Sequence, residues 1–111
     1  MISVVSVKSL PRNWNQDSSF VYIGRPSIFG NPVELNKKCP VCGEYHCIGG
    51  ATIECFTHYF YERLESDLDF QDRVSGLLSV HKTFGSLSLV CWCKPNPCHG
   101  DVIKGYLDKF K

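Results

Sequence analysis

The sequence has no long apolar run and no strong excess of charge of either sign. No segment approaches the ~20 apolar residues that a membrane-spanning helix requires, so we expect none. The 12 Lys and Arg residues nearly balance the 11 Asp and Glu residues, which leaves a net charge of +1. We therefore expect no general electrostatic attraction to nucleic acids or membranes, and any binding to nucleic acid needs a local patch.

The sequence also lacks a targeting signal, internal repeats, low-complexity tracts and an interdomain linker. Residues 1–5 have neither the basic start nor the small-residue cleavage site of a secretory signal peptide, so we expect a cytoplasmic location. The 111 residues predict a single domain, 1–111, which is long enough to bury a core of its own.

Cysteine is the residue type in excess, with 7 copies. An odd number of cysteines in a reducing compartment is typical of metal binding or reactive thiols rather than of a disulfide framework. All but Cys55 fall in two short segments, 39–47 and 91–98. These two segments are the first places to look for chemistry.

The hydrophobic pattern predicts an α/β domain. Strands are expected at 2–8, 19–23 and 87–93, and helices at 51–66, from Asp69 to the break at Gly85, and at 99–110. The nearly continuous apolar run at 87–93 favours a central strand that is buried on both faces. We predict a small, mostly parallel sheet with flanking helices (Rossmann-like). In such sheets ligands bind beyond the carboxyl ends of the strands, which here are loops 24–32 and 93–101.

Three strings resemble a known family: Val21-Tyr22-Ile23-Gly24-Arg25-Pro26-Ser27, Phe29-Gly30-Asn31-Pro32, and Cys91-Trp92-Cys93-Lys94-Pro95-Asn96-Pro97-Cys98-His99-Gly100-Asp101-Val102. The family is domain of unknown function 4326, small proteins common in phages and bacteria. The resemblance implies a phage-related origin, hence a location in the host cytoplasm, and a shared site built from the two loops. It implies no activity. The cysteine-rich segment 37–50 departs from the family pattern, so we expect this insert, within 33–50, to be specific to this chain.

The insert has the spacing of a zinc site. Cys-x-x-Cys-Gly lets two thiolates grip one ion while the glycine turns the backbone. The predicted ligands are Cys39, Cys42, His46 and Cys47. Neighbours His46 and Cys47 compete to reach one ion, and Cys55 or His58 are the alternatives for either. A segment this long without a hydrophobic period needs an organising element, which a metal ion supplies. The alternative is a metal-free pair of thiols in a loop.

The second cysteine cluster allows several interpretations. Cys98 and His99 lie where the last helix begins, and the helix dipole lowers the pKa of a thiol there. The candidate catalytic residues are Cys98, His99 and Asp101. Cys93, Cys98 and His99 also suit a second metal, and the N-terminus of the helix suits an anionic ligand. A purely structural turn in which Asp101 caps the helix is the simplest alternative.

Loop 24–32 has the residue types of an anion site. The Arg25 guanidinium suits phosphate or carboxylate, and Ser27 and Asn31 offer further hydrogen bonds. Aromatic residues nearby are suited to pack against a base, although core packing explains most of them. The predicted ligand-binding residues are Arg25, Ser27, Asn31 and Cys93.

Two functions follow from these patterns. The first is a site for a nucleotide or a nucleic-acid component, either catalytic through Cys98 or binding only. The second is a non-enzymatic, zinc-containing interaction protein that binds a host protein or nucleic acid. The state of Cys98 separates them: an accessible thiolate favours an enzyme, whereas a buried thiol favours a binding protein.

Overall fold

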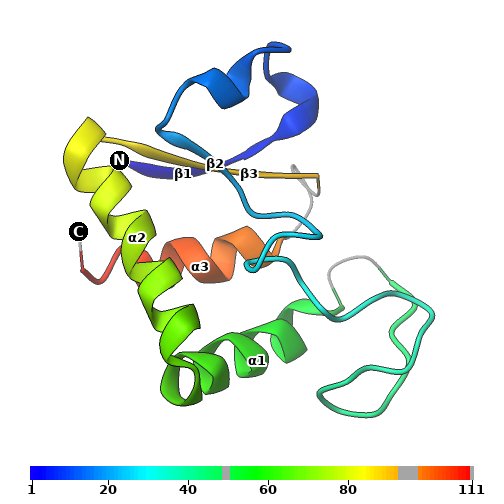
Figure 1. Cartoon of the computed structure of the whole chain (residues 1–111). Coiled ribbons are helices and arrows are strands. Elements are labelled where there is room, and N and C mark those ends of the chain that lie inside the picture. The colour runs from blue at the N-terminus through cyan, green and yellow to red at the C-terminus, as the bar shows by residue number, and fades with distance from the viewer. Residues whose placement is uncertain (49–50, 93–97, 111) are drawn as a thin grey trace.

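A computed structural model of the chain describes residues 1–48, 51–92 and 98–110. The elements are β1 (Ile2–Ser6), η1 (Val7–Ser9), η2 (Trp14–Gln16), β2 (Phe20–Tyr22), α1 (Ile53–Ser66), α2 (Leu68–Phe84), β3 (Leu87–Cys91) and α3 (His99–Leu107). The labels η1 and η2 denote single 3-10 turns. The predicted α/β class is confirmed, with each predicted strand and helix present at its place in the chain (Figure 1).

The sheet is parallel throughout, in the order β1-β3-β2. β3 lies in the middle, where Leu87 pairs with Ile2 of β1 and Val90 pairs with Tyr22 of β2. Four of the five β3 residues are buried, because the strand has a neighbour on each edge and side chains cover both of its faces. The prediction of a central, doubly buried strand is therefore correct.

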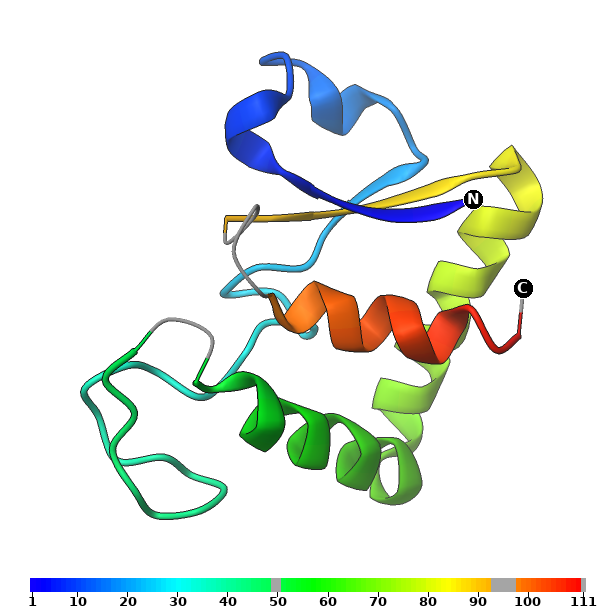
Figure 2. The same ribbon diagram turned by 180° about the vertical axis from the view of Figure 1, so that it is seen from behind.

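The three helices lie on one side of the sheet, and the segment between β1 and β2 lies on the other (Figures 1 and 2). Helix α3 packs directly against β1 and β3, and α1 packs against α3 and α2 as a further layer. Within the described residues, the α-helices thus cover one face of the sheet. β1 is shorter than predicted because the Ser6 hydroxyl accepts the Lys8 N–H at 3.2 Å and starts the turn of η1.

Local capping decides where the helices begin and end. Asp67 ends α1 and starts α2, since its carboxylate accepts the backbone N–H of Phe70 at 3.1 Å. The helix thus begins just before the predicted start at Asp69. Arg63, one turn earlier, donates to the same carboxylate at 3.0 Å, and these bonds lower the pKa of Asp67. Gly85 ends α2 in the left-handed region at φ 75°.

The core fills the space between the sheet and the helices. Aromatic rings from α1 and α2 pack edge to face, with the Phe60 and Phe70 centroids 5.6 Å apart. Ile103 and Leu107 of α3 are fully buried in the same cluster as Leu89 of β3. Within the part of the chain that the structure describes, no helix is long and apolar enough to cross a membrane.

Close packing of α3 on the sheet makes Gly100 sensitive to substitution. A Cβ at Gly100 would lie 2.8 Å from both Ile23 Cδ1 and Val4 Cγ1, so Gly100→Ala should lower the free energy of unfolding by about 1–3 kcal/mol. The matched control is Gly105→Ala in the same helix. A Cβ there meets no atom within 4 Å, so it should raise stability by up to about 1 kcal/mol. Urea unfolding of both variants tests this, and equal effects would contradict the described packing.

Candidate metal centre and carboxyl edge of the sheet

The Cys39–Gly43 segment forms a tight turn that gathers backbone N–H groups around one sulfur. The Sγ atom of Cys39 accepts the N–H groups of Val41 at 3.3 Å and Cys42 at 3.5 Å. Gly43 closes the turn at φ 78°, a left-handed conformation that glycine adopts without strain, and its N–H bonds the Cys39 carbonyl at 3.0 Å. The turn therefore places the Cys39 and Cys42 side chains side by side.

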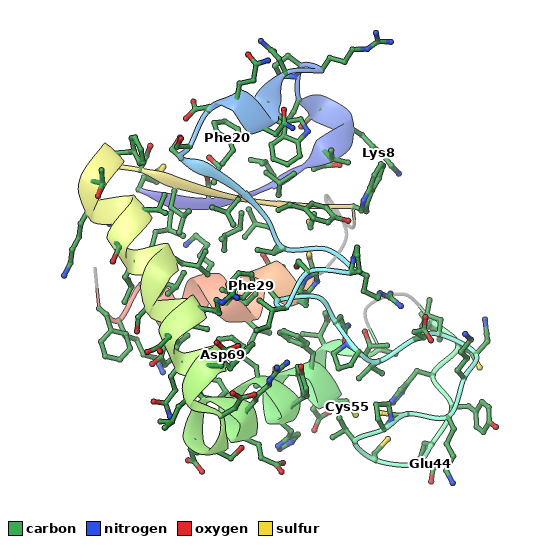
Figure 3. All side chains as sticks on the ribbon, viewed as in Figure 1. Lys8, Phe20, Phe29, Glu44, Cys55 and Asp69 are labelled. Atoms are coloured by element: carbon green, nitrogen blue, oxygen red, sulfur yellow. The ribbon has the colours of Figure 1, made fainter. Side chains whose placement is uncertain are left out.

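The chain then returns antiparallel and brings a histidine back to the turn. Lys38 and Tyr45 form an antiparallel bridge, and the N–H of Asn36 donates to the His46 carbonyl at 2.7 Å. The Nε2 atom of His46 lies 3.5 Å from the Cys42 sulfur and 3.5 Å from the Cys55 sulfur. Cys55 comes from the first turn of α1, at the end of the helix that faces the insert (Figure 3).

Four ligand atoms meet here, all within 4.8 Å of one another: one from each of Cys39, Cys42, His46 and Cys55. Zinc bond lengths at tetrahedral angles place a nitrogen and a sulfur ligand about 3.5 Å apart, which matches both His46 distances. The cluster can hold a metal ion.

Of the predicted ligands, Cys47 lies outside this group. It is exposed, and the structure brings Cys55 to the group instead. The physical reason is that adjacent residues in an extended segment point to opposite sides. Once His46 faces Cys42, Cys47 faces away. The sequence predicts Cys55 only as an alternative ligand. Cys55 lies in a helix thirteen residues after Cys42, and the local spacing gives no sign that the two meet.

The thiols of the cluster have divergent acidities. Burial alone would raise the pKa of Cys39, but the N–H groups of Cys42 and Val41, with help from His46, outweigh it and lower the pKa to about 6. Burial, followed by the neighbouring sulfurs of Cys42 and Cys39, raises the pKa of Cys55 to about 12. Cys39 is thus the thiol that ionises more readily, and a bound cation would favour the ionisation of Cys55 by offsetting the negative charge of its neighbours.

The second place of interest is the carboxyl edge of the sheet, where the residue after β2, Ile23, and the start of α3 lie next to each other. The link is a hydrogen bond from Nε2–H of His99, at the start of α3, to the carbonyl of Ile23 at 2.7 Å. Because a carbonyl only accepts, the proton is on Nε2. Burial, together with the charge of Arg25, lowers the pKa of His99, so the imidazole is neutral. The loop after β2 and the start of α3 are therefore joined.

Cys98 is the N-cap residue of α3 and is fully buried. Its sulfur accepts the Gly100 N–H at 3.3 Å and lies 3.6 Å from Nδ1 of His99. The Asp101 carboxylate accepts the Cys98 N–H at 3.1 Å, which completes a capping box. Asp101 thus caps the helix, as the structural alternative predicted, and Cys98 is a buried residue rather than an accessible one.

The predicted ligand-binding residues have different surroundings. Arg25 is exposed, and its Nη1 donates to Oε1 of Glu34 at 2.9 Å. The buried hydroxyl oxygen of Ser27 has no hydrogen-bond partner in the described part of the chain. Asn31 is buried and serves the fold: it donates to the Thr52 hydroxyl at 3.1 Å and accepts the Val33 N–H at 2.9 Å. Cys93 lies outside the described residues.

Comparison with known proteins gives one match. The model of a family described as domain of unknown function (DUF4326) matches residues 7–109, nearly the whole length. The chain belongs to the DUF4326 family. No curated protein and no solved structure matches it. The DUF4326 description states no activity, so the two sites are the basis for assigning a function.

Burial predicts a wide spread of thiol reactivity in this DUF4326 protein. Cys47 is exposed, whereas Cys91 and Cys98 are fully buried, so alkylation of folded protein should label Cys47 quickly and the two buried cysteines only on unfolding. Peptide mapping after a short alkylation at neutral pH checks this, with urea-unfolded protein as the reference for complete labelling. Labelling of Cys98 as fast as that of Cys47 would restore the nucleophile hypothesis.

Proposed function

We propose that this DUF4326 protein is a non-enzymatic binding protein whose insert is held in place by one structural zinc ion. The observation that carries the proposal is the convergence of Cys39, Cys42, His46 and Cys55. Three sulfurs and one imidazole are a donor set that suits zinc. Four protein ligands fill a tetrahedral shell and leave no position for substrate, so the ion serves stability rather than Lewis-acid catalysis.

The ligands support a fold-holding role because they come from two separate parts of the chain. Cys39, Cys42 and His46 lie in the insert, and Cys55 lies in α1. Cys39 and Cys55 also pack with Val33 in a small apolar cluster of their own, separate from the main core. An ion bound here replaces the core that this long irregular segment lacks.

Cys55→Ser is the decisive substitution for zinc binding. Protein purified without chelator should hold about one zinc ion per chain by elemental analysis, and Cys55→Ser should lose it together with the order of the insert while the sheet stays folded. Cys47→Ser is the matched control: that thiol is exposed and outside the cluster, so its zinc content should equal that of the parent. Loss of zinc in the Cys47 variant, with retention in the Cys55 variant, would refute the ligand assignment.

The ligand that we propose for this binding protein is a small phosphate-bearing anion of the nucleotide type at the carboxyl edge of the sheet. A buried hydroxyl without a partner costs about 1–3 kcal/mol, and within residues 1–48, 51–92 and 98–110 the Ser27 hydroxyl has none. Arg25, two residues away, is bound to Glu34 in an exposed ion pair, which contributes only about 0–1 kcal/mol and is readily exchanged for a phosphate. The start of α3 does not supply the site, since Cys98 and Asp101 bond its first N–H groups.

The composition of the insert surface favours a second partner, a host protein. Four of its large apolar side chains are exposed: Leu35, Val41, Tyr45 and Ile48. Exposed apolar side chains gathered in one segment mark interaction surfaces. The phage-related origin that the family resemblance implied fits such a role.

Arg25 should dominate the binding of a simple anion. In a 1H–15N NMR titration with inorganic phosphate, amide signals of residues 24–30 should shift, and Arg25→Gln should weaken binding about tenfold, the loss expected for one charge-assisted bond. Arg12→Gln removes another exposed arginine, outside this edge, and should leave the titration unchanged. Equal weakening by both variants would show that phosphate responds only to the net charge of the protein.

A further inference from the structure

An aromatic ring is held in a fixed orientation at this edge and left open to solvent. Trp92 follows the last residue of β3, and 55% of its surface is exposed. Its indole N–H donates to the Tyr22 hydroxyl at 3.0 Å. The hydrogen bond holds the indole ring by the edge that carries its N–H group. The exposed part of the ring surface stays open to contact with a ligand.

The Tyr22 side chain is held in turn by a second hydrogen bond. The Tyr22 hydroxyl donates to the carbonyl of Arg25 at 2.9 Å, so that two successive hydrogen bonds join Trp92 to the loop that carries the proposed anion site. Gly24 allows this arrangement: a Cβ at that position would collide with the Tyr22 ring. This relay of two hydrogen bonds, from Trp92 through Tyr22 to Arg25, therefore positions Trp92 relative to loop 24–32.

Two hydrogen bonds and the turn from Gly24 to Ser27 thus connect three residues with complementary binding properties. Trp92 offers a π-face, Arg25 offers a cation whose ion pair with Glu34 is exposed, and Ser27 offers a hydroxyl without a partner in the described residues. Aromatic stacking and cationic phosphate contacts are the two interactions by which proteins hold a nucleotide unit without reading its sequence. A phosphate alone or a carboxylate would leave the exposed ring unused.

We infer that Trp92 stacks on the base of a nucleotide whose phosphate is held by Arg25 and Ser27, an inference that rests on the proposed anion site and assigns its ligand class. The Tyr22 hydroxyl acts as a positioning group for Trp92. The nucleotide unit comes either from a free mononucleotide or from a single strand of nucleic acid, and the chemistry recognised is the same for both. Base identity contributes little, because every base has a face that stacks.

The experiment uses the fluorescence of Trp92. The full chain carries Trp14→Phe, which leaves Trp92 as the single tryptophan, and circular dichroism checks that it folds. AMP, CMP, ribose 5-phosphate and inorganic phosphate are then titrated in parallel, together with a short oligothymidylate. Both nucleotides should quench the fluorescence and bind about tenfold or more tightly than ribose 5-phosphate, the ratio expected for one stacked base. Oligothymidylate binding tighter than the mononucleotides identifies a single strand as the source, and equal binding identifies a free nucleotide.

Variants separate the stacking from the anion site. Trp92→Ala, measured by NMR or calorimetry, should reduce nucleotide affinity to that of ribose 5-phosphate and leave the latter unchanged, whereas Trp92→Phe should retain most of the ratio because it keeps an aromatic face. Tyr22→Phe removes both hydrogen bonds of the relay and should give an intermediate loss. If nucleotides and ribose 5-phosphate bind equally to the parent protein, the stacking inference fails while the anion site stands. If none of the phosphates binds, both fail.

Discussion

The position of β3 between two parallel neighbours is the constraint on which the rest of the molecule depends. A parallel strand pair needs a crossover connection, and β2 reaches β3 only through the insert, α1 and α2. Because the pairing is parallel, β2 and β3 end at the same edge of the sheet. Residues that are about seventy apart in the sequence, such as Tyr22 and Trp92, then bond directly. Both proposed sites depend on this arrangement: one lies within the long connection, and the other lies at the carboxyl edge of the sheet, where the connection begins and where β3 ends.

The two sites are also coupled through the loop between them. Asn31 leaves the proposed anion loop and donates to Thr52, the residue that precedes α1, while its oxygen fixes Val33 beside Cys39 and Cys55. Glu34, the next residue, holds Arg25. A metal ion that fixes Cys55 against the insert therefore also limits the motion of the segment that presents the arginine. Stability and ligand binding share residues 31–34.

The residues at the start of α3 show how a chemically suggestive motif can serve the fold. Cysteine, histidine and aspartate are common catalytic types, but Cys98 and Asp101 satisfy each other's backbone groups, and His99 bonds Ile23 across the sheet edge. Burial keeps the imidazole neutral. The motif therefore has a structural role in this chain, because it caps α3 and joins its start to the residue after β2.

Part of the fold and part of the candidate metal cluster were determined by the sequence alone. The continuous apolar run of β3, the helical periodicity of α1 and α2 and the glycine after α2 depend on nearest neighbours, so the element order and the central strand were predictable. So was the Cys-x-x-Cys-Gly turn, because five residues suffice to fold it around Cys39. Tertiary structure decided the rest. Whether His46 or Cys47 faces the other cysteines depends on backbone direction. The choice of Cys55 depends on where α1 packs, and the burial of Cys98 depends on the packing of α3 against Ile23. These are contacts between segments far apart in the chain, and local patterns carry no information about such distances.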